Sequence, residues 1–136
     1  MLHHISLGAH QFDRTARFYD AVLAPLGFVR VWTVERPEGR AVGYGLPNGG
    51  DQLAIKEVRA EIPSIPGFHL AFTASGPHAV RAFYEAALAH GGADHGEPGF
   101  RPHYGPNYYA AFVLDPEGHR LEAVCNGHAP EGKEPP

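Results

Sequence analysis

The feature that constrains this chain most is a weak internal repeat, in which residues 4–27 match residues 69–92 at a constant spacing of 65 residues. A repeat of this kind predicts that one small folding unit occurs twice. Each unit begins with a histidine, so two equivalent histidines could start a metal site between the halves. The matching positions are His4 with His69, Phe18 to Ala21 with Phe83 to Ala86, Leu23-Ala24 with Leu88-Ala89, and Gly27 with Gly92.

The size and composition are those of one compact domain. The chain has 136 residues, of which 43% are apolar and 19% charged, an ordinary globular balance. A net charge of −4 and scattered Lys and Arg argue against a nucleic-acid surface. No apolar run is long enough for a membrane span. Cys125 is the only cysteine, and the N-terminus shows no signal-peptide pattern, so we expect a cytoplasmic protein.

Module one, residues 1–62, is predicted to contain a strand, a helix and three further strands. In the first strand Ile5 and Leu7 share one face, and His4 lies on the other. An apolar stripe at helical spacing predicts the helix, with Asp13 as its N-cap. Turns rich in Pro and Gly separate the later strands. The predicted elements are a strand at 2–8, a helix at 13–24, and strands near 28–34, 40–46 and 52–58.

Module two, residues 66–126, repeats this order after a linker at 63–67. A strand at 68–73 precedes a helix for which Ser75 is the predicted N-cap and Pro77 lies in the first turn. The turn Asp115-Pro116-Glu117-Gly118 then joins the two strands of a clear hairpin. Each half is therefore β-α-β-β-β, in a domain of residues 1–126. Residues 127–136 contain almost no apolar side chains and are predicted to be a disordered tail.

Strand alternation places three chemically useful side chains on the face away from the helices. His4 and His69 each lie opposite the apolar residues of their strands, and Glu122 lies opposite Leu121. The sequence therefore predicts that His4, His69 and Glu122 line a common cavity. Cys125 lies on the helix side and is predicted to be inert core.

These segments resemble the vicinal oxygen chelate superfamily, which includes glyoxalase I, bleomycin- and fosfomycin-resistance proteins and extradiol dioxygenases. The resemblance covers about residues 1–126. It implies an α+β fold in which two tandem βαβββ modules form a cupped mixed sheet, with helices on the outer face, around a divalent metal. The ligands it implies are His4, His69 and Glu122. The segments that carry it are HISLG, RTARFYDAVLAPLGF, FHLAF and FVLDPEGHRLEAV.

A fourth ligand, which glyoxalase I-like members usually carry, has two candidate positions. The repeat register puts Glu57 opposite Glu122. Strand alternation instead puts Glu57 on the helix side with Ile55 and leaves Ala54 at the ligand position, unless a β-bulge intervenes. We favour alternation, because a one-residue slip would turn the apolar residues into the cavity. The fourth ligand is then absent.

Two histidines and a carboxylate with open positions suit Fe(II), Zn, Ni, Co or Mn. The implied function is a metal-dependent lyase, isomerase or oxygenase that acts on a small substrate with adjacent oxygens. An isomerase would need Glu122 as the base that removes a proton from carbon, so Glu122 would have to leave the metal. An oxygenase would use a nearby acid-base group, and His103 and Tyr109 are candidates. Hairpin pairing predicts Tyr109 on the Glu122 face. The predicted substrate-binding residues are Tyr104, Asn107 and Arg120.

The alternative function is a non-enzymatic small-molecule binder of the bleomycin-resistance kind, which would need no metal. Because sheet edges of such folds are commonly covered by a second copy, we expect a homodimer. The other histidines are predicted to lie at the surface, namely His3, His10, His78, His90, His95, His119 and His128.

Overall fold

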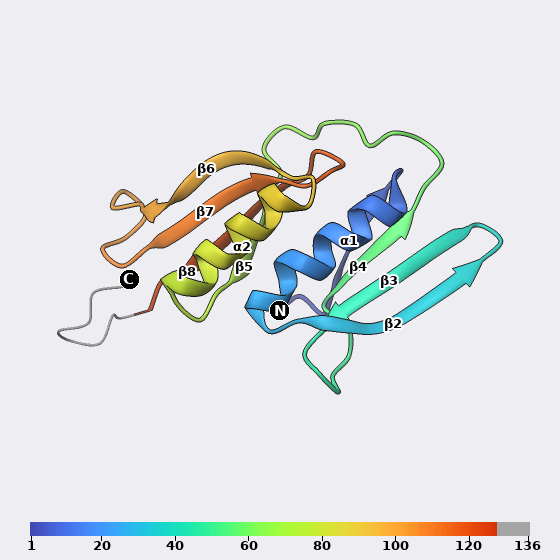
Figure 1. Ribbon diagram of the computed structural model, residues 1–136, viewed down its shortest axis with the longest axis horizontal. Coiled ribbons are helices and arrows are strands. Elements are labelled where there is room, and N and C mark those ends of the chain that lie inside the picture. The colour runs from blue at the N-terminus through green and yellow to red at the C-terminus, as the bar shows by residue number, and fades with distance from the viewer. Residues whose placement is uncertain (128–136) are drawn as a thin grey trace.

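The computed structural model describes residues 1–127, which form two modules of the same topology (Figure 1). The predicted α+β fold with two tandem βαβββ modules is confirmed. Most of the predicted disordered tail, residues 128–136, lies outside the described residues. This part of the chain includes His128. Module one contains β1 (Ile5–Ala9), α1 (Phe12–Leu23), the 3₁₀ turn η1 (Ala24–Leu26), β2 (Val29–Arg36), β3 (Gly39–Gly45) and β4 (Leu53–Glu57). Module two contains β5 (Leu70–Thr73), α2 (Pro77–Ala89), β6 (Ala93–Phe100), β7 (Tyr109–Leu114) and β8 (Arg120–Cys125).

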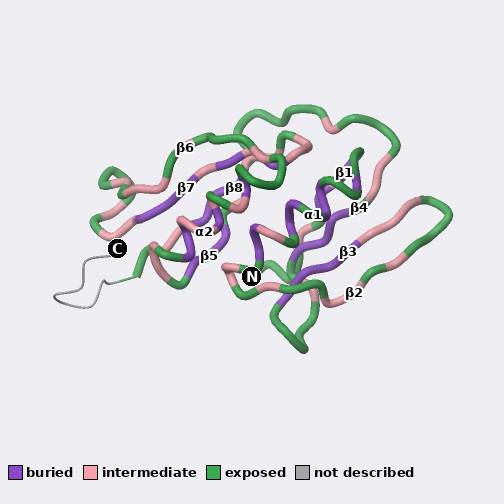
Figure 2. The backbone as a smooth tube through the Cα atoms, viewed as in Figure 1, coloured by how far each residue is buried: buried purple, intermediate pink, exposed green. Residues whose placement is uncertain are grey.

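The strands form two four-stranded sheets rather than one continuous sheet. Sheet A has the order β1-β4-β3-β2, and sheet B has the order β5-β8-β7-β6. In each sheet the first strand pairs in parallel with the last strand of its module, and the other pairs are antiparallel. The outer strands β2 and β6 are largely exposed, whereas the buried backbone follows β7, β8 and the inner part of sheet A (Figure 2).

The two helices lie side by side in the middle of the molecule and pack against each other (Figure 1). Helix α1 buries Phe18, Tyr19, Val22 and Leu23 completely, since these residues recur at helical spacing. Gly27, with a φ of 89°, lets the chain turn away after η1. None of the helices in the described residues could cross a membrane.

The predicted helix caps are wrong. The N-cap of α1 is Gln11 rather than Asp13, and the N-cap of α2 is Gly76 rather than Ser75. Neither cap residue makes a side-chain cap hydrogen bond. Pro77 does occupy the first turn of α2, where its missing N–H costs nothing.

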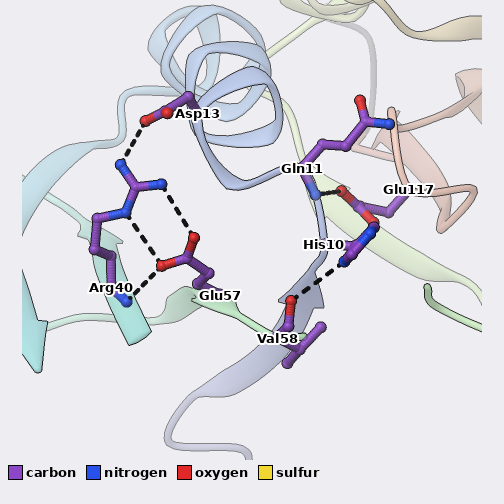
Figure 3. A network of polar contacts seen from close by, with 7 residues as sticks. All are labelled: His10, Gln11, Asp13, Arg40, Glu57, Val58 and Glu117. Carbon is purple, nitrogen blue, oxygen red and sulfur yellow. Dashed lines mark hydrogen bonds and ion pairs between the residues drawn. The ribbon is translucent and has the colours of Figure 1, made fainter. Parts of the chain in front are cut away.

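The turn between β7 and β8 supplies the missing cap of α1 from the other module. The Oε2 atom of Glu117 accepts from the backbone N–H of Gln11 at 2.7 Å (Figure 3). The same oxygen accepts from Thr15 Oγ1 at 2.9 Å. A carboxylate at a helix N-terminus also interacts favourably with the helix dipole. Burial alone would raise the pKa of Glu117, but the backbone N–H groups of His10 and Gln11 outweigh it and lower that pKa.

The same turn makes two more contacts that fix module two against module one. Tyr19 donates its hydroxyl proton to Oδ2 of Asp115 at 2.5 Å, and both residues are buried. Burial raises the pKa of Asp115 and of Tyr19. His119 Nε2 lies 3.0 Å from the carbonyl oxygen of Gly8 in β1 and donates to it. The prediction that His119 is a surface residue is wrong, because this contact half-buries it between the modules.

Candidate metal and ligand site

The centre of the candidate site in module two is a contact between His69 and Glu122. His69 immediately precedes β5, and Glu122 lies in the middle of β8, directly opposite Ala71. Paired residues in a sheet point to the same side, so His69, Ala71 and Glu122 share a face, as predicted. The Nε2 atom of His69 lies 3.2 Å from Oε1 of Glu122.

Glu122 is nearly inaccessible, with 2% of its surface exposed. A buried carboxylate needs partners for both oxygens, and Tyr108 supplies the second one. The Tyr108 hydroxyl donates a short hydrogen bond to Oε2 of Glu122. Burial and this bond raise the pKa of Tyr108 to about 12, so the phenol keeps its proton at neutral pH. Tyr108 was not among the predicted site residues.

The segment 101–108 between β6 and β7, here called the aromatic loop, stacks its rings toward Glu122. The ring centroids of His103 and Tyr104 are 4.1 Å apart, and those of Tyr104 and Tyr108 are 5.2 Å apart. His103 and Tyr104 are both exposed, Tyr104 by 58%, so this part of the row is open to solvent, while Tyr108 at the other end bonds Glu122. His103 and Tyr104 are therefore connected to the candidate site through ring contacts.

The predicted position of Tyr109 is wrong. In the hairpin Tyr109 pairs with Cys125, and Phe112 pairs with Glu122. Tyr109 therefore lies on the helix side, where its hydroxyl accepts from Arg81 of α2. The register differs by one residue from the predicted one, and such a slip exchanges the two faces. Tyr108, one residue earlier, is the tyrosine that contacts Glu122.

Within residues 1–127, two predicted substrate-binding residues, Asn107 and Arg120, make no hydrogen bond to Glu122. Asn107 is half-buried in the aromatic loop. Arg120 begins β8 and donates to the carbonyl oxygen of Ile65 in the linker at 3.1 Å. Cys125 is half-buried rather than fully buried, and burial raises its thiol pKa.

His4 lies apart from the other two predicted ligands. It precedes β1, is exposed, and its Nδ1 atom is 2.8 Å from Nδ1 of His3. Both histidines line a hollow of about 290 Å³ between the two modules, together with Gln52 of module one and residues 70–73 of β5. A larger hollow of about 430 Å³ lies between α1 and strands β2 and β3, and none of the predicted site residues lines it.

Within residues 1–127, no three His, Cys, Asp or Glu side chains converge as a metal site requires. The predicted triad of His4, His69 and Glu122 is therefore not assembled within one chain. Only the pair in module two is in contact. The physical reason is the placement of the modules, because the contacts of the β7–β8 turn and the two packed helices hold β1 and β5 as separate sheet edges.

Glu57 has a structural partner and lies on the other side of its sheet. It pairs with Ala9 in the parallel ladder, on the helix side, as alternation predicts. Arg40 donates to both of its carboxylate oxygens at 3.1 Å and also bonds Asp13 of α1 at 2.8 Å (Figure 3). The Arg40 guanidinium lowers the pKa of Glu57 to about 2. Glu57 is therefore not available to ligands on the opposite face, where Ala54 stands beside Ser6.

Comparison with known families agrees with this architecture. The family model described as "Glyoxalase/Bleomycin resistance protein/Dioxygenase superfamily" matches residues 1–123. The chain belongs to this superfamily. The comparison with curated proteins gave no match.

Solved structures of superfamily members have the same fold. A glyoxalase/bleomycin resistance protein from Albidiferax ferrireducens is 27% identical, with a TM-score of 0.70 over 89% of this chain and 94% of that one. A glyoxalase-related enzyme from Fulvimarina pelagi is 26% identical, with a TM-score of 0.66 over 90% and 86%. A fosfomycin resistance protein from Listeria monocytogenes, crystallised with Mn(II) and sulfate, is 16% identical, with a TM-score of 0.65 over 93% of each chain.

Proposed function

We propose that this protein is a small-molecule-binding metalloprotein that works as a homodimer. In this proposal His69 and Glu122 of one copy hold a divalent transition metal, and His4 of the second copy completes the ligand set. The observation that carries the proposal is the contact between His69 and the buried Glu122. Membership of a superfamily that includes a Mn(II)-bound protein supports it.

The spacing of the two groups suits a shared metal. Two ligands at about 2.1 Å from one metal ion lie about 3.0–3.4 Å apart, depending on the coordination angle. The separation of His69 Nε2 and Glu122 Oε1 is 3.2 Å. Imidazole and carboxylate together suit Zn, Fe(II), Ni, Co or Mn. Two ligands alone make an incomplete metal site, so His69 and Glu122 of one chain meet only part of what a metal ion needs.

A second copy is a better source of the third ligand than a movement within one chain. One such movement is a shift of the two modules, because His4 precedes β1 of sheet A and Glu122 lies in β8 of sheet B. That shift would break the buried Tyr19–Asp115 bond and the Glu117 cap of α1. His4 is exposed, so a partner could receive it without such a loss. A homodimer also gives the open sheet edges a cover.

The side chains around the pair would bind and orient the substrate. A bound metal would supply Lewis-acid stabilisation of a substrate with adjacent oxygens. Tyr108 would keep Oε2 of Glu122 in place through its hydrogen bond, while the exposed ring of Tyr104 would contact the substrate. The reaction class that fits is a lyase, isomerase or oxygenase reaction in the cytoplasm.

Elemental analysis of protein purified without chelators tests the proposal. Wild-type protein should carry close to one transition-metal ion per chain. His69→Ala, Glu122→Gln and His4→Ala should each retain less than about a tenth of that metal, because losing even a supporting group typically weakens binding tenfold to a hundredfold. Glu57→Gln and His78→Ala are matched controls that remove a carboxylate and an exposed imidazole elsewhere, and both should keep the metal.

One observation favours a second candidate, a metal-free binder of the bleomycin-resistance kind. Both oxygens of Glu122 already have partners, in His69 and Tyr108. The same measurement separates the two functions. A wild-type protein without stoichiometric metal, whose content is unchanged in the three ligand variants, would contradict the metalloprotein proposal and favour the binder.

A further inference from the structure

The larger hollow, of about 430 Å³, lies between α1 and strands β2 and β3. It is on the helix side of sheet A, opposite the open side, which faces away from the helix. Tyr44 marks the helix side, because its hydroxyl bonds the carbonyl oxygen of Ala16 in α1. Arg30 pairs with Tyr44 and therefore points to the same side. The volume is within the range of small-molecule pockets, about 300–1,000 Å³.

Two ion pairs connect α1 to the strands that line this hollow. Asp20 of α1 accepts from Arg30 of β2 through two hydrogen bonds, at 2.7 and 2.9 Å. Asp13 of α1 accepts from Arg40 of β3 at 2.8 Å (Figure 3). Asp13 and Asp20 lie about two helical turns apart, so the two ion pairs are spaced along the helix. They hold α1 and the strands in a fixed relation on both sides of the residues between them.

Arg17 lies on α1 between these two ion pairs. It follows Asp13 by four residues and precedes Asp20 by three, so the three side chains share one face of the helix. Arg17 lines the hollow and is exposed. In the part of the chain that the structure describes, its guanidinium makes neither a hydrogen bond nor an ion pair. The helix therefore presents one uncompensated positive charge to the hollow.

Glu35 presents the opposite charge from β2. It pairs with Arg40 in the β2–β3 ladder, which places it on the helix side, and it lines the hollow. Arg40 does not hold it, because the Arg40 guanidinium bonds Asp13 and Glu57 instead. The Glu35 carboxylate has no hydrogen bond or ion pair with any residue of 1–127. Arg17 and Glu35 thus line one hollow without pairing with each other.

The hollow also has an apolar lining. Phe12, Ala16 and Val42 contribute to it, and all three are buried. The Arg40 guanidinium lies over the Phe12 ring, 4.8 Å from the ring centroid, and so helps to fix the position of this ring. An aliphatic chain could cover this lining without leaving a polar group unpaired.

We propose that this hollow binds a small zwitterion, an aliphatic amino acid whose ammonium and carboxylate groups lie at opposite ends of the chain. Arg17 binds the carboxylate, because a guanidinium offers parallel N–H donors to its two oxygens, and Glu35 binds the ammonium group. A ligand with a single charge would leave one of these side chains without a partner. A simple anion gains little from Arg30 and Arg40, since carboxylates already neutralise both.

The inference goes beyond the proposed function and needs neither a metal nor a second copy. NMR titration of metal-free, full-length protein with three probes tests it. The probes are 6-aminohexanoate, hexanoate and hexylamine, which share a chain and differ in their charges. Wild-type protein should bind 6-aminohexanoate about threefold more tightly than either other probe, with shifts of the amide signals of residues 13–17 and 33–35. Equal affinity for the three probes, or shifts confined to other segments, would overturn the proposal.

Single substitutions separate the two contacts. Arg17→Met should lower the affinity for 6-aminohexanoate about threefold and leave that for hexylamine unchanged. Glu35→Gln should lower the affinity for 6-aminohexanoate by a similar factor and leave that for hexanoate unchanged. Arg36→Met and Glu38→Gln are matched controls, because Arg36 ends β2, Glu38 lies in the following turn, and neither lines the hollow. Both controls should bind all three probes as the wild type does.

The double variant Arg17→Met/Glu35→Gln completes the set. It should bind the three probes with equal and weak affinity, because only the apolar lining is left to contact them. Both substituted side chains are exposed, so thermal unfolding should show that every variant keeps its fold. Wild-type affinity for 6-aminohexanoate in a folded Arg17→Met or Glu35→Gln variant would overturn the proposal.

Discussion

Glu57 and Glu122 lie 65 residues apart in the chain, but they lie on opposite sides of their sheets and show how the neighbours of a carboxylate decide its role. Glu57 lies on the helix side and is held by the Arg40 guanidinium. Glu122 lies on the open side, where only neutral or weakly basic donors, Tyr108 and His69, contact it. A carboxylate already paired with a guanidinium has little affinity left for a metal, whereas one bonded by a phenol and an imidazole can exchange its partners.

The Arg40–Glu57 pair predicts a specific pH dependence. Because its pKa falls from 4.5 to about 2 on folding, Glu57 binds fewer protons in the folded state than in the unfolded state. Its contribution to stability is therefore present above about pH 4.5 and is lost as the pH falls toward 2. Glu57→Gln should have a free energy of unfolding that depends less on pH in this window than that of the wild type.

Denaturant unfolding at pH 5, 4 and 3 checks this expectation. The matched control is Glu85→Gln, which removes an exposed carboxylate of α2 that makes no ion pair with any other residue of 1–127. This variant should follow the wild-type pH dependence. Equal slopes for Glu57→Gln and wild type between pH 5 and 3 would contradict the assigned role of Arg40.

At the scale of elements, the β7–β8 hairpin both positions Glu122 and holds the modules together. Its turn caps α1 through Glu117, and the following strand carries Glu122 five residues later. The segment FVLDPEGHRLEAV, the most specific part of the family resemblance, therefore contains one metal-ligand candidate and the main polar contacts between modules. Any shift of this turn would therefore move Glu122 and the contacts between the modules together.

The cap from Glu117 predicts a measurable loss of stability when it is removed. Glu117→Ala leaves the N–H of Gln11 and the hydroxyl of Thr15 without their acceptor. Loss of a helix cap typically costs about 1 kcal/mol, which for a chain of this size lowers Tm by about 4 °C. Calorimetry should show this decrease for Glu117→Ala and almost none for Glu85→Ala. An unchanged Tm in Glu117→Ala would show that the contact between modules contributes nothing.

The sequence predicts the positions of the helices and strands better than it predicts strand registers and helix caps. The helix at 13–24 and the hairpin turn at 115–118 were predictable because apolar spacing and Pro-Gly chemistry are local signals. The segment YYAAFVL is apolar on both faces, so alternation could not choose between Tyr108 and Tyr109. The cap of α1 comes from Glu117, about a hundred residues away in the chain, where no local pattern could reveal it. The bulge in β2, where Trp32 rather than Val31 pairs with Gly43, also has no local signal in the sequence.

At the scale of the whole molecule, the repeat predicts two modules but not their relative placement. His69 and Glu122 were correctly predicted to share a face, because one ladder of hydrogen bonds connects their strands. His4 belongs to the other sheet, so its distance from the pair depends on how the modules dock. That docking is set by α1 against α2 and by the buried Tyr19–Asp115 bond. Within one chain, this docking does not bring His4 together with His69 and Glu122.

The central claim is that a second copy closes this triad, and mixed dimers test it most directly. Chains that carry His4→Ala are co-expressed with chains that carry His69→Ala, each with a different affinity tag, and the mixed dimer is isolated through both tags. A ligand set shared between copies leaves one of the two sites complete. The mixed dimer should then hold half the wild-type metal, although each variant alone holds almost none.

The reciprocal pairing should give the opposite result. When one chain carries both His4→Ala and His69→Ala and its partner is wild type, a shared site predicts almost no metal, because each site then lacks a histidine. A site within one chain predicts half the wild-type metal for this pairing and none for the first. Metal in the reciprocal pairing alone, or a protein that remains monomeric, would contradict the account.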